Sequence, residues 1–153
     1  MDEIDKKILQ ILQENCRIQY HKIAERLGIA PSTVHFRVKR MVENGIIKSF
    51  SAIVDPEKVG YETIAWIGLS VDPRKIDEIA KKLASYDEVQ IVATSTGDHD
   101  IILQAIARNE KDLWRFVNNK IKVIKGVRKD FHVSTFLDIY KRTHVIFINN
   151  KDS

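Results

Sequence analysis

Residues 1–44 have the hydrophobic spacing of three short helices. Residues 2–15, 20–27 and 31–44 each repeat apolar side chains at intervals of three and four positions, which is typical of amphipathic helices. The apolar positions in these ranges include Ile4, Ile8, Leu9, Ile11 and Leu12, then Ile23, Ala24 and Leu27, then Val34, Val38 and Met41. Gly28 and Gly45 follow the second and third ranges, where glycine commonly ends a helix.

The second and third predicted helices are separated by a tight turn at Ile29 and Ala30. Pro31 suits the first position of the third helix, because its missing N–H would be unpaired there in any case. Two short helices joined in this way predict a helix-turn-helix. Residues 46–54 read as one or two strands with Lys48 exposed, which would form a small wing.

The pattern changes after the turn at residues 55–57. Strands are expected at residues 64–71, 89–94, 100–107 and 127–140, and helices at residues 72–84 and 110–124. Residues 96–99 form the turn of a hairpin, and residues 145–148 favour a short additional strand. The predicted order, βαββαβ, indicates a ferredoxin-like layer of two helices on an antiparallel sheet.

The whole chain is therefore predicted to be an α+β protein of two domains. We expect a winged helix-turn-helix over residues 1–54, a linker over residues 55–61 and a ferredoxin-like domain over residues 62–142. Residues 143–153 would form a C-terminal strand and tail.

Composition adds few constraints. The apolar stretches are too short to span a bilayer, and the acidic N-terminus lacks the features of a secretory signal. The single cysteine, Cys16, allows no internal disulfide, so a cytoplasmic location is expected. No cysteine–histidine cluster has zinc spacing, and we expect no cofactor, no metal, no catalytic residues and no membrane partner.

The charge is concentrated near the third predicted helix. Residues 31–50 carry Arg37, Lys39, Arg40 and Lys48 against a single acidic residue, Glu43, which gives this segment +3 of the chain's net charge of +4. A basic helix that follows a tight turn fits the major groove of DNA, where residues near its N-terminus reach base edges.

Two segments carry a resemblance to a known family. The sequence IAERLGIAPSTVHFRVKRMVENGIIKSF, residues 23–50, and the sequence STGDHDI, residues 95–101, resemble the Lrp/AsnC, or feast/famine, regulators. The resemblance covers nearly the whole chain. It implies a DNA-binding transcription regulator that dimerises through its C-terminal sheets, assembles further into a higher oligomer such as an octamer, and binds a small effector, commonly an amino acid.

The candidate sites combine this resemblance with the helical pattern. The expected DNA-binding residues are Tyr20, His21, Lys22, Ser32, Thr33, His35, Phe36, Arg37, Lys39, Arg40 and Lys48. The expected effector-binding residues are Thr96, Gly97, Asp98, His99, Asp100, His132 and Ser134. The chain departs from the family pattern at Ala30, Phe36, His99, Asp130 and His132.

Several of these residues have a second interpretation. Arg37 reads DNA or acts as a structural clamp, and Phe36 meets a thymine methyl group or packs against the first helix. The Gly97–Asp100 segment binds an effector ammonium group or is a plain hairpin turn, since glycine and aspartate favour turns for local reasons.

The strand at residues 64–71 is apolar on both faces, because Ile64, Trp66 and Gly68 alternate with Ala65, Ile67 and Leu69. One face meets the helices, and a second sheet is the natural cover for the other. This pattern favours a homodimer without reference to the family.

Two other functions remain open at this point. Siroheme decarboxylases have a two-domain arrangement that is similar to the one predicted here. His99 and His132 would suit such an enzyme, although the basic third helix argues against it. An architectural DNA-binding protein would lack an effector and any sequence preference.

Overall fold

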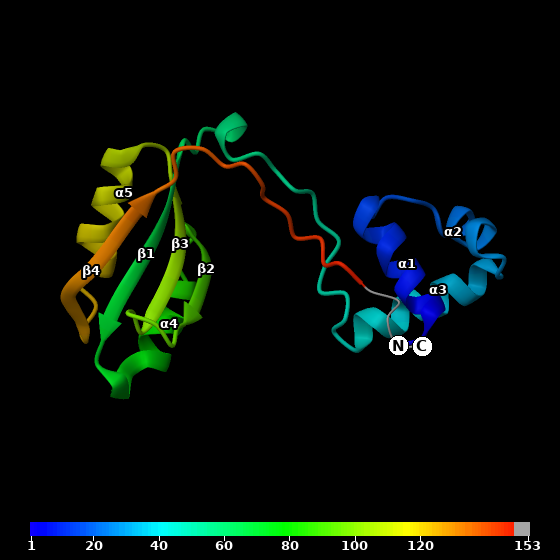
Figure 1. The fold of residues 1–153 in the computed structure, drawn as a ribbon, viewed down its shortest axis with the longest axis horizontal. Helices are drawn as coiled ribbons and strands as arrows, with labels where there is room; N and C mark the ends of the chain where they lie inside the picture. Colours follow the sequence, from blue (N-terminus) through cyan, green and yellow to red (C-terminus); the bar gives the residue numbers. More distant parts are fainter. Residues whose placement is uncertain (149–153) are drawn as a thin grey trace. The chain divides into compact units, whose positions relative to one another are not determined.

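The structure is a computed structural model that describes residues 1–148, in two compact units (Figure 1). One unit contains Met1–Ile53 together with the described residues after Lys141. The other unit contains Val54–Lys141.

The N-terminal unit is built from the three predicted helices, α1 (Glu3–Glu14), α2 (Tyr20–Leu27) and α3 (Pro31–Glu43). Their apolar stripes meet in one core, as the spacing predicts. The buried members are Ile8, Leu9, Leu12, Ile23, Ala24, Val34, Val38 and Met41.

The helix ends follow from local sequence. Asp2 caps α1: its Oδ1 accepts from the Asp5 N–H at 2.9 Å, while Asp5 Oδ2 accepts from the Asp2 N–H at 3.1 Å. This reciprocal capping box satisfies two N–H groups that the helix itself leaves unpaired. Gly28 ends α2 with a φ of 66°, a left-handed conformation that favours glycine.

The strands expected at residues 46–54 are not formed. The N–H groups of Ile46 and Ile47 both donate to the Met41 carbonyl, at 2.9 and 3.1 Å, so they close the end of α3 and are unavailable to a strand ladder. The rest of this range has no regular secondary structure.

The strand expected at residues 145–148 is also not formed. The Ile146 N–H donates to Gln13 Oε1 at 2.7 Å, and the Ile146 carbonyl accepts from Gln13 Nε2 at 3.0 Å. The side chain of α1 thus takes both hydrogen-bonding groups that a neighbouring strand would need. Ile148 packs against the helical core. The remainder of the predicted tail, residues 149–153, lies outside the described residues.

The second unit has the predicted βαββαβ order. It contains β1 (Thr63–Val71), α4 (Ile76–Ala84), β2 (Val89–Thr94), β3 (Ile101–Ala107), α5 (Glu110–Phe116) and β4 (Val127–Thr135). The strands form one antiparallel sheet in the order β2-β3-β1-β4 (Figure 1). A 3-10 turn, Glu57–Val59, precedes β1 within the predicted linker.

The larger differences from the predicted boundaries lie at α4, α5 and β4, whereas the other elements agree to within one residue at each end. A 3-10 turn, Pro73–Lys75, precedes α4, and a π-helical turn, Val117–Ile121, continues α5. β4 ends at Thr135, opposite Ala65 of β1, and not at residue 140. Just beyond it, the Phe136 N–H donates to the Ile64 carbonyl at 2.8 Å.

One face of the sheet packs against both helices. Ala65, Ile67 and Leu69 of β1 point into a core that also holds buried residues of β3, α4 and α5. The alternate residues of β1, among them Trp66 and Gly68, point to the other face, which no helix of this unit covers. None of the helices within the described residues is long and apolar enough to cross a membrane.

Candidate DNA-binding and effector sites

The candidate recognition helix, α3, is fixed at both ends. Ala30 occupies the N-cap position with an extended backbone and provides no side-chain hydrogen bond. At the other end, the Gly45 N–H donates to the Val42 carbonyl and the Ile46 N–H to the Met41 carbonyl, each at 2.9 Å. With Gly45 at a φ of 69°, these two bonds form a Schellman motif, and Gly45 ends the helix as the sequence predicts.

The outward face of α3 carries most of the candidate residues. Val34, Val38 and Met41 are buried, whereas Ser32, His35, Phe36, Lys39 and Arg40 are exposed. The side chain of Phe36 is 64% exposed, so the alternative in which it packs against α1 is wrong. Ser32, Phe36 and Lys39 form a ridge opposite the buried stripe, which we call the α3 ridge.

The other candidate DNA-binding residues flank this ridge. His21 and Lys22 are exposed on α2, and Lys48 is exposed after the end of α3. Tyr20 and His35 meet edge to face, with ring centroids 5.9 Å apart, so this pair links α2 to α3. Thr33 is half-buried.

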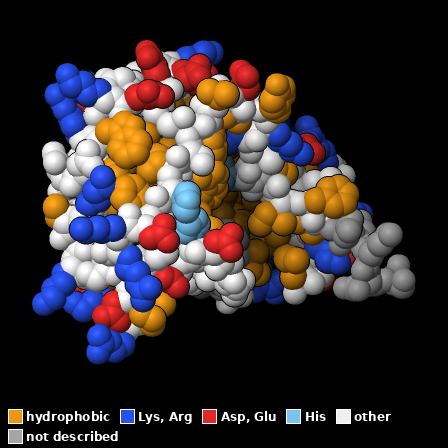
Figure 2. Space-filling model, turned by 60° about the vertical axis from the view of Figure 1, so that its left-hand side comes forward, with side chains coloured by type: hydrophobic (Ala, Val, Ile, Leu, Met, Phe, Trp, Pro, Cys, Tyr) orange, Lys and Arg blue, Asp and Glu red, His pale blue; other side chains and the backbone are white. Residues whose placement is uncertain are grey.

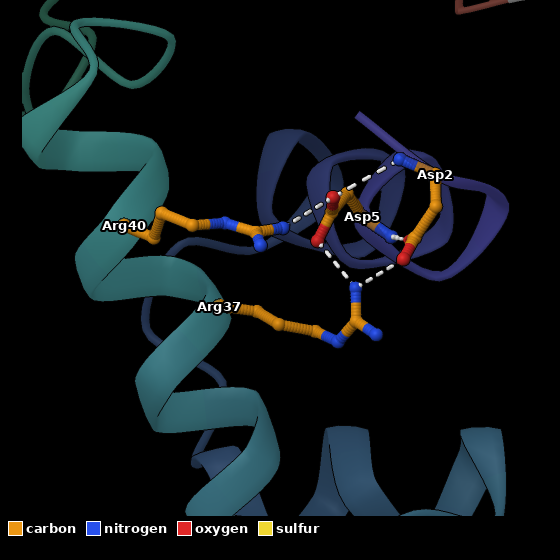
Figure 3. Close-up of polar contacts among 4 residues, drawn as sticks. All are labelled: Asp2, Asp5, Arg37 and Arg40. Carbon is orange, nitrogen blue, oxygen red and sulfur yellow. Dashed lines mark hydrogen bonds and ion pairs between the residues drawn. The ribbon is translucent and has the colours of Figure 1, made fainter.

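The two arginines of α3 turn toward α1 (Figure 3). Arg37 Nη1 lies 2.6 Å from Asp2 Oδ2 and 2.9 Å from Asp5 Oδ1, and Arg40 Nη2 lies 2.9 Å from Asp5 Oδ2. The side chain of Arg37 is 19% exposed and that of Arg40 is 45% exposed, whereas that of Asp5 is 1% exposed. Arg37 therefore has the geometry of the structural clamp.

Electrostatics favours the charged forms in this cluster. The backbone N–H of Asp5, followed by the Arg37 guanidinium, lowers the pKa of Asp2 below its usual value. Burial on its own raises the pKa of Asp5, but the hydrogen bonds from Arg37 and from the Asp2 N–H outweigh it, and the net pKa is lowered. The sequence analysis did not predict these ion pairs, which join residues more than thirty positions apart.

The candidate effector turn connects β2 to β3. Thr96, Gly97 and Asp98 are exposed at its tip. The Gly97 N–H donates to Ser95 Oγ at 3.2 Å, and the Ser95 N–H donates to the Asp100 carbonyl at 3.0 Å. The tip thus presents the Asp98 carboxylate to solvent on a backbone held by local hydrogen bonds.

Asp100, by contrast, is engaged with the sheet. Its Oδ2 accepts from the Val71 N–H at 2.7 Å, and its own N–H donates to the Leu69 carbonyl at 2.9 Å. The pairing of β1 with β4 shifts register between Leu69 and Val71, so Asp100 stabilises an irregular part of the strand. One carboxylate oxygen of Asp100 is therefore committed to the fold.

His99 lies on the open face of the sheet, directly over Gly68 of β1. Its ring centroid is 4.9 Å from that of His132, the β4 residue that pairs with Gly68 of β1. His99 Nδ1 is buried and has no hydrogen-bond partner among the described residues. Ser134 lies two positions further along β4, opposite Trp66. The turn and β4 therefore bring His99, His132 and Ser134 onto one surface.

The surroundings of these histidines are largely apolar. Trp66 is 36% exposed, Ile91 is also exposed, and hydrophobic side chains reach the surface beside a histidine (Figure 2). Across residues 1–148, no group of three histidine, cysteine, aspartate or glutamate side chains is placed to hold a metal ion.

Comparison with known proteins gives the same two-part division. Residues 1–48 match the family model described as winged helix-turn-helix DNA-binding, and residues 64–146 match the Lrp/AsnC ligand binding domain. The HTH-type transcriptional regulator FL11 of Pyrococcus furiosus is 38% identical over 94% of this chain and 93% of its own length.

Solved structures extend the similarity to the fold. AsnC of E. coli has a TM-score of 0.88 at 28% identity, over 95% of this chain and 97% of that one. A Neisseria meningitidis transcriptional regulator, described as a complex with L-Met, has a TM-score of 0.90 at 30% identity, over 97% of both chains. The chain is a DNA-binding transcription regulator with a ligand-binding domain, and it belongs to the Lrp/AsnC family.

Proposed function

We propose that this regulator is cytoplasmic and binds duplex DNA as a homodimer, placing the α3 ridge in the major groove. The observation that carries the proposal is the exposure of Phe36 on a helix whose opposite face is fully buried. An exposed phenylalanine between polar side chains suits an apolar contact to a base edge, such as a thymine methyl group.

The footprint combines reading and anchoring residues. Ser32, Thr33 and Phe36 lie in the first half of α3, which is the part of a recognition helix that reaches bases. Lys39 and Lys48 supply exposed positive charge for phosphates. His21, Lys22 and the Tyr20–His35 pair flank these residues and complete the proposed surface.

Two variants test this footprint in equilibrium binding assays. Lys39→Gln should reduce the log–log salt slope of DNA affinity by about 0.9, the value for one lost phosphate contact. Phe36→Ala should weaken binding to the operator and leave non-specific binding nearly unchanged, because an apolar contact releases no counterions. The loss should shrink when the contacted thymine is replaced by uracil. Unchanged operator binding in Phe36→Ala would remove the ridge from the interface.

We further propose that the β2–β3 turn binds an amino acid. The exposed Asp98 carboxylate suits an ammonium group. His99 follows it in the turn and contacts His132, and Ser134 lies on the same strand as His132, so these three residues offer further polar groups. Thr96 and Gly97 supply the backbone of the turn, and Asp100 holds that turn on β1. The structural relative described as an L-Met complex supports this class of effector.

A thermal-shift screen of the twenty amino acids tests the effector class, because a ligand that binds only the folded state raises the melting temperature. The effector found must then change operator affinity, and DNA must change effector affinity by the same factor. Asp98→Asn should weaken effector binding with little change in effector-free DNA affinity. If no amino acid binds or alters DNA affinity, the architectural alternative is favoured. We propose no catalytic step and no cofactor for the histidine pair.

The homodimer is proposed to form on the open face of the sheet. Trp66 and Ile91 are exposed there, and a second copy of the sheet would remove both from water. Further assembly into a higher oligomer such as an octamer is what family membership suggests. Sedimentation analysis of the parent protein and of Trp66→Lys tests the interface: the variant should shift toward the monomer, and an unchanged dimer would place the interface elsewhere.

A further inference from the structure

The acidic residues at the start of α1 change the charge that α3 presents to DNA. We call Asp2 and Asp5 the acidic pair. Arg37 contacts both carboxylates and Arg40 contacts Asp5, so the four side chains carry two negative and two positive charges (Figure 3). Two of the four cations in residues 31–50 therefore already have counter-ions inside the protein.

An arginine in this state contributes little to DNA affinity. A protein cation strengthens DNA binding mainly by displacing cations that are condensed on the phosphates. A guanidinium that is neutralised by a carboxylate brings no net charge to the phosphate and displaces little. Lys39, at the outward side of α3, has only a 3.8 Å contact to the exposed Glu43, so its charge remains available.

The acidic pair is held firmly in place. The two aspartates bond reciprocally through the capping box, which fixes their orientation relative to α1. Asp5 is almost fully buried, and its two oxygens accept from Arg37, Arg40 and the Asp2 N–H. Moving Arg40 to a phosphate would remove one partner from a buried carboxylate, which is unfavourable.

We propose that the acidic pair acts as an internal counter-ion for Arg37 and Arg40, keeps both arginines out of phosphate contacts and so lowers the affinity for DNA of any sequence. Asp2 and Asp5 are then positioning residues that act through the two arginines. The inference rests on the DNA-binding surface proposed above, in which Lys39 and the α3 ridge make the contacts.

The salt dependence of binding to a non-specific duplex tests this inference, with all variants in the full chain. Arg37→Gln and Arg40→Gln should leave the log–log slope unchanged, whereas Lys39→Gln lowers it by about 0.9. Asp5→Asn should release Arg40, raise the slope by up to about 0.9 and strengthen binding about eightfold at 0.1 M salt. Circular dichroism of each variant serves as the control for folding.

Glu3→Gln is the matched control, because Glu3 lies in the same helical turn but pairs with Lys6, and within residues 1–148 it has no ion pair with α3. It removes the same charge without releasing an arginine, so its slope should rise less than that of Asp5→Asn. Equal rises in the two variants would overturn the inference, as would a loss of about 0.9 in Arg40→Gln. If Asp5→Asn does not fold, the two arginine variants decide the matter. If only Lys39→Gln leaves the slope unchanged, the proposed DNA-binding surface is contradicted. The slopes of Arg37→Gln, Arg40→Gln and Asp5→Asn would still decide whether the acidic pair acts as a counter-ion.

Discussion

Replacing Gly68 by alanine should destabilise the C-terminal unit through His99. A Cβ built on Gly68 would lie 2.6 Å from His99 Cγ and Nε2, and closer still to Cδ2, whereas carbon atoms prefer separations of about 3.5–4.0 Å. Gly68 pairs with Ile102 on one side and His132 on the other, so its backbone has little room to shift. The His99 ring must move instead and lose its contact with His132.

The size of the effect follows from this geometry. Adding a methylene to a well-packed site costs about 1–3 kcal/mol. His99 is a partly exposed side chain that can rotate away, so we expect the lower half of this range, roughly 1–2 kcal/mol. For a unit of this size each kcal/mol corresponds to a shift of about 4–8 °C in melting temperature.

Intrinsic fluorescence provides a selective assay. Both tryptophans of the chain, Trp66 and Trp114, lie in the C-terminal unit, so their emission during urea unfolding reports on that unit. A double-mutant cycle with His99→Ala isolates the clash. In the His99→Ala background, Gly68→Ala should be neutral or stabilising, since glycine within a strand costs about 0.5–1 kcal/mol relative to alanine.

Gly97→Ala is the control for the loss of a nearby glycine. A Cβ there would meet Ser95 Oγ at an ordinary 3.6 Å, so little change in stability is expected. Equal destabilisation by Gly68→Ala in both backgrounds would refute the reasoning, because the clash would then not involve His99.

Three further predictions concern helix capping, the β1 irregularity and acid stability. Ala30→Ser should stabilise the N-terminal unit by about 1 kcal/mol in urea unfolding followed by circular dichroism, because serine supplies the missing N-cap oxygen; a neutral result would mean that the cap geometry does not accept serine. Asp100→Ala should cost about 1.5–3 kcal/mol, because the Val71 N–H loses a charged acceptor; an unchanged unfolding midpoint by tryptophan fluorescence would contradict this. The folded-state pKa values of Asp2 and Asp5 are lowered, so their contribution to stability is complete above the unfolded value of about 3.9 and is lost as pH falls through the lowered values. The melting temperature of the helical unit, followed by circular dichroism, should therefore fall in that acidic window, and it should fall less in Asp5→Asn than in the parent protein. Identical pH profiles of melting temperature for parent and variant would count against the ion pairs.

Local sequence patterns predicted most of the secondary structure. The bounds of α2 and β2 coincide with the predicted ranges, and the core stripes of all three N-terminal helices are buried as their spacing requires. The strands predicted at residues 46–54 and 145–148 failed for a common reason. β-branched residues favour strands, but a strand also needs partners for its backbone groups, and here Met41 and Gln13 take those groups instead.

The candidate sites were predictable only in part. Helical spacing places Phe36 and Lys39 opposite the core, but it leaves Arg37 at the side of the helix, where clamp and reader are equally consistent with the pattern. The choice depends on Asp5, more than thirty residues earlier in the chain, and no periodicity connects the two. Similarly, the glycine–aspartate turn gave no sign that Asp100 bonds to the backbone of β1.

The contact between Gln13 and Ile146 has a consequence for how the chain is divided. The chain leaves the helical unit after Ile53 and returns to it after Lys141, so in chain order the unit that holds the sheet is inserted between two segments of the helical unit. Two stretches of chain therefore connect the two units, one after Ile53 and one after Lys141. A fragment that stops at residue 53 would lose the segment that packs Ile148 on its core. A fragment that keeps this packing would join residues 142–148 to residues 1–53, for example through a short linker.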